Sequence, residues 1–79
     1  MKKLNIGCGS NRLPGWINRD ILIDGFDVTK LPLPYEDDSL DFILIEHVLE
    51  HINNQEGFSV LEDFLRVLKP GGAARICVP

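Results

Sequence analysis

This chain consists of short apolar runs that are separated by clusters of Gly and Pro. It also contains one stripe of apolar residues at helical spacing. Continuous apolar runs are typical of parallel strands buried on both faces. The predicted strands cover residues 4–7, 16–20, 26–28, 40–45 and 73–78. The stripe consists of Phe58, Leu61, Phe64, Leu65 and Leu68 and predicts a helix over residues 55–68, which Asn53 or Asn54 could cap. The pattern predicts one α/β domain over residues 1–79.

The connections between the predicted strands are short. Ten residues separate Gly9 from Asp20, and a parallel crossover usually needs more, so we expect a single helical turn or an irregular loop there. Residues 21–25 leave no room for a helix, so only residues 55–68 supply a full covering helix. Because crossovers are right-handed, one face of the sheet should stay largely bare. A bare apolar face favours self-association or a partner chain.

Composition narrows the choice of partners. The chain has 8 Lys and Arg against 12 Asp and Glu, a formal net charge of −4, which argues against a broad nucleic-acid surface. Two cysteines without a secretory signal give no disulfide framework. No apolar run approaches the roughly 18 residues of a membrane span. We therefore expect a cytoplasmic protein without a membrane partner.

The first predicted strand ends in a glycine turn. The run Leu4–Ile6 leads into Gly7-Cys8-Gly9, and glycine lets the backbone approach a ligand at the carboxyl edge of a parallel sheet. Asp20 ends the second strand, where a carboxylate can accept hydrogen bonds from ribose hydroxyls. Asp24 would take that role in a shifted register, and both carboxylates could instead be turn residues. This order predicts a nucleotide-type ligand.

A metal-type motif follows the central strand. His47, Glu50 and His51 form His-x-x-Glu-His, which on a helix would place two histidines on one face for zinc. No acidic third ligand is identifiable downstream. We therefore predict a site without metal.

Five ordered segments resemble the class I S-adenosylmethionine (SAM) dependent methyltransferases. They are the glycine turn, Asp20, Asp27–Pro32, Leu40–Ile45 and Leu68-Lys69-Pro70-Gly71-Gly72. The resemblance spans residues 4–79 and implies a Rossmann-like three-layer fold with a mainly parallel sheet of strand order 3-2-1-4-5. Full domains of this family are longer, so residues 1–79 are expected to form the cofactor-binding part.

The resemblance also implies a reaction and a set of site residues. The expected function is methyl transfer from SAM to an acceptor that the sequence does not identify. The implied cofactor-binding residues are Asn5, Gly7, Cys8, Gly9, Asp20, Ile21, Asp27, Val28, Glu46 and His47. His47 is the candidate general base, which is needed only where the acceptor loses a proton. The family carries similar His-Val-Leu-Glu-His stretches without metal.

Two other functions use the same residues. A non-catalytic SAM-binding or assembly module, completed by a partner chain, would keep the cofactor site without turnover. An NAD-dependent oxidoreductase also combines glycines with a carboxylate, but its acidic residue lies about 20 positions further on. The short spacing to Asp20 and Asn11 in place of a third glycine disfavour that second alternative.

Overall fold

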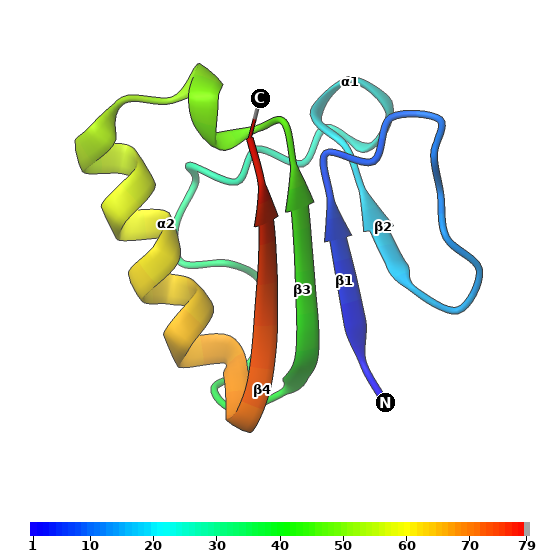
Figure 1. The fold of residues 1–79 in the computed structure, drawn as a ribbon, viewed down its shortest axis with the longest axis vertical. Coiled ribbons are helices and arrows are strands. Elements are labelled where there is room, and N and C mark those ends of the chain that lie inside the picture. The colour runs from blue at the N-terminus through cyan, green and yellow to red at the C-terminus, as the bar shows by residue number, and fades with distance from the viewer. Residues whose placement is uncertain (79) are drawn as a thin grey trace.

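Four parallel strands form one sheet in the order β2-β1-β3-β4 (Figure 1). The computed structural model describes residues 1–78. The strands are β1 (Lys3–Ile6), β2 (Ile17–Arg19), β3 (Leu40–Glu46) and β4 (Leu68–Cys77). The helices are α1 (Ile21–Asp24), the 3-10 turn η1 (Leu49–His51) and α2 (Asn54–Val67). Within residues 1–78, no helix is both long and apolar enough to cross a membrane.

The arrangement confirms the Rossmann-like fold and corrects its expected strand order. The predicted third strand, residues 26–28, is not a strand, so β2 is an edge strand rather than an inner one. Asp27 explains the difference, because its side chain accepts hydrogen bonds from the Thr29 N–H and hydroxyl and its carbonyl accepts from the Lys30 N–H. These bonds bend the chain into a turn, and Val28 is buried in the core instead.

The two short connections behave differently from each other. Residues 8–16 form an irregular loop, as predicted. Residues 21–25, for which we predict no helix, contain the single turn α1. Asp20 caps it by accepting from the Leu22 and Ile23 N–H groups, and Gly25 ends it in the left-handed region at φ 67°. A cap at each end makes a four-residue helix possible where a longer one has no room.

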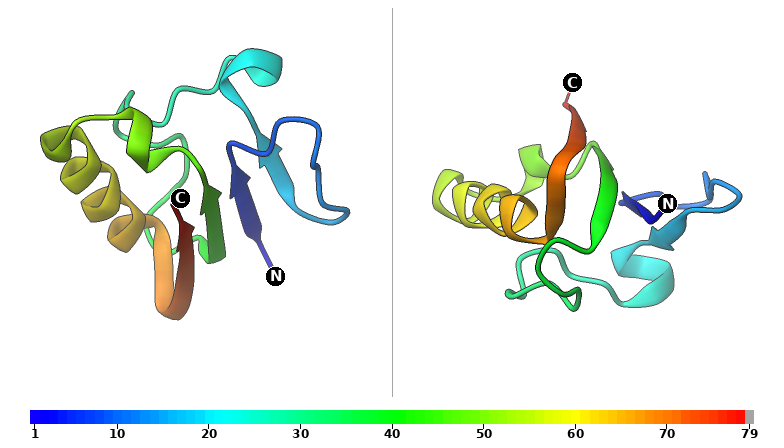
Figure 2. Two further views of the ribbon diagram at one scale, coloured as in Figure 1. Left: turned by 45° about the horizontal axis from the view of Figure 1, so that its top comes forward. Right: turned by 90° about the horizontal axis from the view of Figure 1, so that it is seen from below.

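Helix α2 covers one face of the sheet. Asn53 caps the helix and forms a capping box with Glu56. Val60, Phe64 and Val67 on its inner side are buried. They form one core with the loop between α1 and β3 and with inward-facing strand residues; these partners are Leu4, Ile6, Val28, Leu33, Leu40, Ile43 and Ile45. Figure 2 shows α2 and this loop on the same side of the sheet.

Strand β4 begins directly after α2. The segment Leu68–Gly72 joins the helix predicted over residues 55–68 to the strand predicted over residues 73–78, and in the structure it already belongs to β4. The pairing with β3 shifts register between Leu40 and Phe42. Glycine is needed here, because a Cβ on Gly72 would lie 2.9 Å from the Lys69 carbonyl oxygen. Residues 68–72 therefore form the irregular first part of β4, where the pairing with β3 shifts register.

The opposite face of the sheet has no covering helix among residues 1–78, as predicted. Phe42 points to this open face, where Trp16 meets it edge-on at 5.6 Å between ring centroids. The Lys3 ammonium lies 5.0 Å from the Trp16 ring centroid. A shallow hollow over this face is lined by Trp16, Phe42, Leu44, Glu46 and Arg75.

Candidate functional site

A cavity of about 380 Å³ opens at the carboxyl ends of the strands. Its volume falls in the range of small-molecule sites, roughly 300–1,000 Å³. It lies where the glycine turn, α1, the segment after α1 and the segment after β3 meet. The lining residues are Ile6, Gly7, Asp20, Ile21, Phe26, Asp27, Val28, Thr29, His47, Val48, His51 and Ile52.

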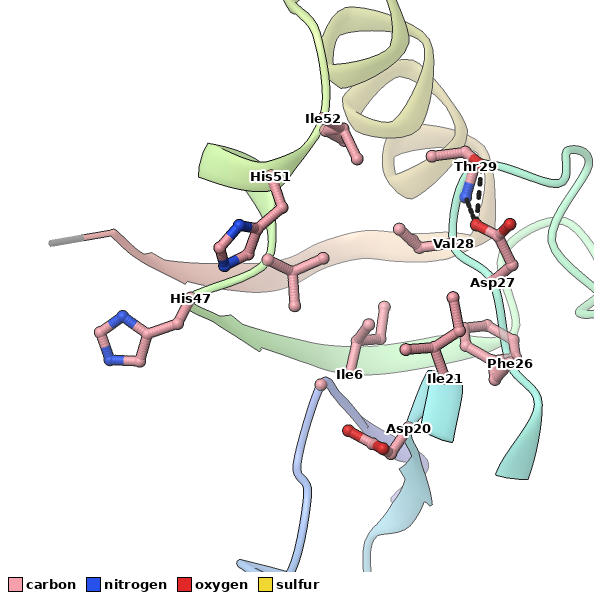
Figure 3. A pocket seen from close by; sticks show the side chains of 12 residues that line it. Ile6, Asp20, Ile21, Phe26, Asp27, Val28, Thr29, His47, His51 and Ile52 are labelled. Atoms are coloured by element: carbon pink, nitrogen blue, oxygen red, sulfur yellow. Dashed lines mark hydrogen bonds between the residues drawn. The ribbon is translucent and has the colours of Figure 1, made fainter. Parts of the chain in front are cut away.

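Polar groups lie at the margins of this cavity and apolar groups in its middle (Figure 3). His47 and His51 lie at one end, and Asp27 with Thr29 at the other. Ile6, Ile21 and Val28 lie between them. The cavity therefore suits an elongated ligand that is polar at its ends.

Gly7 lets the end of β3 approach the glycine loop, by which we mean residues 7–16. Its φ is 74°, and a Cβ there would clash with the Val48 side chain and lie 3.3 Å from the Glu46 carbonyl oxygen. The Gly7 N–H donates to the Arg19 carbonyl at 2.8 Å. The Gly9 N–H donates to Asp20 Oδ1 at 3.0 Å. Both glycine donors are thus used inside the protein, and Gly7 contributes space to the cavity rather than a free N–H.

Asp20 lies in the cavity and Asp24 outside its lining. Besides Gly9, the Asp20 carboxylate accepts from the Leu22 and Ile23 N–H groups at 3.0 and 3.2 Å. Asp24 is bound by Arg12 at 3.1 Å. Of the two carboxylates, Asp20 therefore serves both as helix cap and as cavity wall.

Asp27 is held as a carboxylate by the turn that it forms. Its Oδ1 accepts from the Thr29 N–H at 2.9 Å and from the Thr29 hydroxyl at 2.7 Å. These two bonds lower the Asp27 pKa below its ordinary value. Asp27 is therefore ionised at neutral pH, and its charge lies beside the apolar middle of the cavity.

His47 adopts a left-handed backbone, with φ 57°. Its N–H donates to the Cys77 carbonyl at 2.8 Å, which continues the β3–β4 pairing through this unusual conformation. His47 Nδ1 and His51 Nε2 lie 3.8 and 3.9 Å from Glu50 Oε2, and both imidazoles are exposed. Such a conformation is costly for a residue other than glycine and is often found at functional sites.

The zinc interpretation of these residues does not fit the structure. The motif runs from a left-handed residue into the 3-10 turn η1, not along one α-helix. In residues 1–78, no group of three His, Cys, Asp or Glu side chains is placed to hold a metal ion.

Six of the ten predicted cofactor-binding residues line the cavity, and four do not. Asn5 is 3% exposed, and its amide donates to Asn18 Oδ1 and to the Asn11 carbonyl. Cys8 is buried, and Gly9 is tied to Asp20. The Glu46 side chain lines the hollow of the open face instead. Side chains alternate along a strand, which puts Glu46 on the other side from Ile45.

The other lining residues were not assigned to the cofactor site from the sequence. Val48 and Ile52 carry an i, i+4 apolar signal that could have been used. The Asp-x-Thr pattern could likewise have indicated the Thr29 turn. Phe26 was assigned to a strand over residues 26–28, and His51 was considered only as part of the His-x-x-Glu-His motif, so neither was assigned to the cavity.

Comparisons with known proteins agree on one family. A family model described as a methyltransferase domain matches residues 18–76. Demethylmenaquinone methyltransferases of two strains of Tropheryma whipplei, Twist and TW08/27, are each 44% identical over 50 residues. The matched segment is 63% of this chain but only 20% of each relative, so the chain spans about a fifth of their length. No solved structure matches the chain.

Proposed function

Since this chain belongs to the class I SAM-dependent methyltransferase family, we propose that its cavity binds SAM for transfer of a methyl group to an acceptor. One observation carries the proposal. The cavity has an anionic end at Asp27, a carboxylate wall at Asp20 and an apolar middle. Adenosine joined to an amino acid matches that order of polar and apolar surfaces.

The residues present can be assigned to parts of SAM. Both turn bonds of Asp27 go to Oδ1, which leaves Oδ2 to accept from the adenine amino group. Ile21 and Val28 would pack against the adenine ring. Asp20 would accept from the ribose hydroxyls while it holds the Gly9 N–H. Gly7 leaves space for the methionine part.

The chemistry requires little of the protein beyond alignment. SAM when bound supplies a methyl group on a positively charged sulfur. Carboxylates at Asp20 and Asp27 favour a cation electrostatically, and the apolar wall formed by Ile6 and Val48 excludes water. Exposed His47 would accept a proton from an acceptor that must lose one. A demethylated quinone is the first acceptor to test, because the curated relatives are named for demethylmenaquinone.

Calorimetric titration of SAM, S-adenosylhomocysteine and NAD into the purified chain tests the cofactor. We expect saturable binding of the first two and none of NAD. Asp27→Asn should weaken S-adenosylhomocysteine binding about tenfold, a loss of one charged hydrogen bond. Glu36→Gln, at an exposed acidic residue outside the cavity lining, is the charge-matched control. A folded chain that binds NAD but not SAM would contradict the proposal.

Asp20 needs a milder variant than alanine. Asp20→Ala would remove the cap of α1 and the tie to Gly9 together. Asp20→Asn removes the charge and keeps one oxygen acceptor, although its amide nitrogen replaces one of the two oxygens that accept from Gly9 and from Leu22 and Ile23. For this variant, both S-adenosylhomocysteine affinity and the circular dichroism spectrum should be measured. The spectrum reports whether the fold is kept, so that a loss of affinity can be told apart from unfolding.

The open face supports the prediction of a homo-oligomer. Trp16, Phe42 and Leu44 form an apolar strip there, with Glu46 and Arg75 beside it. A surface that carries both charge signs beside an apolar strip can match its own copy across a two-fold axis. We expect a dimer by sedimentation at micromolar concentration and a monomer for Phe42→Glu. A wild-type monomer would contradict this part of the proposal.

Turnover separates the enzyme from the alternative. The non-catalytic module completed by a partner chain also predicts a surface in need of covering. Methyl transfer to any of a panel of acceptors would support the enzyme. Binding of SAM without turnover by the chain alone would support the module. Turnover that appears only after a partner chain is added would support it as well.

A further inference from the structure

The glycine loop has no crossover helix to hold it, and we infer that Arg12 is a positioning residue that fixes this loop against α1 for cofactor binding. The inference rests on the proposed function. It concerns a side chain outside the cavity lining, to which neither the sequence pattern nor the comparisons assign a role.

Amide groups hold the base of the glycine loop. Asn18 Oδ1 accepts from the Asn5 amide at 3.0 Å and from the Leu13 N–H at 2.9 Å. The Asn18 amide donates to the carbonyls of Leu13 and Trp16 at 2.9 and 3.1 Å. The Asn5 amide also donates to the Asn11 carbonyl at 3.4 Å. These bonds hold the backbone on both sides of Arg12 but do not join the loop to α1.

The Arg12 side chain joins the loop to α1. Its guanidinium donates to both oxygens of the Asp24 carboxylate, at 3.1 and 3.2 Å, and to the Asn18 carbonyl at 3.0 Å. A bidentate arginine–carboxylate pair fixes direction as well as distance. The pair thus joins the glycine loop to the last residue of α1.

These contacts close a ring that includes the cavity wall. Asp24 Oδ2 also accepts from the Asp20 N–H at 2.8 Å. Asp20 Oδ1 in turn accepts from the Gly9 N–H at 3.0 Å. The chain from Gly9 to Arg12 completes the ring. Two sides of the cavity, the glycine loop and α1, are therefore held at one separation before a ligand arrives, which lowers the cost of binding.

The ring depends on an exposed charge pair. The hydrogen bond between the two side chains lowers the pKa of Asp24 and raises that of Arg12. Their side chains are 38% and 23% exposed for Arg12 and Asp24, so dissolved salt screens their attraction. Salt should therefore weaken cofactor binding through this pair.

Titration of S-adenosylhomocysteine at 50 mM and 500 mM NaCl tests the inference. Arg12→Ala should weaken binding about threefold to tenfold at low salt, with a smaller difference from wild type at high salt. Asp24→Asn should behave alike, and the double variant should be no worse than either single one. The affinity of Arg12→Lys should lie between those of wild type and Arg12→Ala, because lysine keeps the positive charge but cannot donate to both carboxylate oxygens in the bidentate geometry of arginine. Lys2→Ala, which removes an exposed charge before β1, is the control and should match wild type.

Amide hydrogen exchange at Gly9 gives a second measurement that needs no ligand. If the ring exists in solution, the Gly9 N–H should exchange faster in Arg12→Ala while amides in β3 stay protected. Unchanged affinity and unchanged Gly9 exchange in Arg12→Ala would overturn the inference. The inference would also be overturned if the loss of affinity in Arg12→Ala were fully explained by a larger fraction of unfolded protein. If the wild-type chain does not bind S-adenosylhomocysteine, the proposed function fails, and Gly9 exchange still decides whether Arg12 fixes the loop.

Discussion

The two faces of the sheet differ in what holds the rest of the chain against them. On the covered face, α2 and the segment after α1 bury a continuous apolar core. On the open face and its edge, the glycine loop is held by side-chain hydrogen bonds from Asn18 and Arg12. Apolar packing is strong and insensitive to direction, whereas hydrogen bonds are weaker and fix geometry. The covered face therefore supplies most of the stability and part of the cavity wall, and the hydrogen bonds at the open face and its edge fix the position of the glycine loop.

The largest effect should come from a break in the covered face. Phe64 is 2% exposed in the core, and Phe64→Ala should cost about 3–5 kcal/mol of unfolding free energy. That loss would leave a domain of this size largely unfolded. Phe42→Ala on the open face should cost about 1 kcal/mol, since this ring is only half-buried. Urea unfolding followed by circular dichroism measures both, and equal losses would contradict the division of roles.

A smaller loss is expected from the glycine loop. Asn18→Ala removes four hydrogen bonds and leaves the Leu13 N–H without its partner. The expected cost is about 2 kcal/mol, because partly buried polar groups lose their bonds. Fluorescence of Trp16, the single tryptophan, should change with it. A stability loss without any change in Trp16 emission would show that the amides do not hold the loop.

The smallest effect should be a dependence on pH. Asp63 accepts from Arg66 and from the Leu33 N–H, and these bonds lower its pKa. A lowered pKa stabilises the fold above the ordinary value of about 3.9, and this contribution is lost as pH falls through the lower folded value. Asp63→Asn should therefore cost about 1.5 kcal/mol at pH 7 and almost nothing near pH 2. Urea midpoints over this range test it, and a constant difference would exclude the linkage.

The strands and α2 could be predicted from the sequence because their signals are local. Apolar runs marked β1 and β3, and the stripe Phe58, Leu61, Phe64, Leu65 and Leu68 marked α2. The stripe predicted the helix but not its buried face, because Phe58 and Leu65 are exposed while Val60 and Val67 are buried beside Phe64. The turn at Asp27 was predicted as a strand, because a buried Val28 looks the same in a turn as in a strand. Side-chain capping by Asp20 also overcame the lack of room for α1.

The site was predictable only where residue type alone decides. Gly7, Asp20 and Asp27 each have a special backbone conformation or a charge, and all three line the cavity. Glu46 and Asn5 have suitable chemistry but point away from the cavity, because the alternation along a strand depends on register. Arg12 carries no motif, and only the folded chain brings it to Asp24.

The place of β1 has a consequence for how the chain is made. β1 is synthesised before β3, yet it lies inside the sheet between β2 and β3. Its pairing with β3 joins positions about 40 residues apart, as the contact of Lys2 with Asp41 illustrates. On the ribosome, this strand must therefore wait for β3 to emerge, with its apolar residues exposed to chaperones or to other nascent chains. Folding should be limited by that late closure rather than by formation of α2.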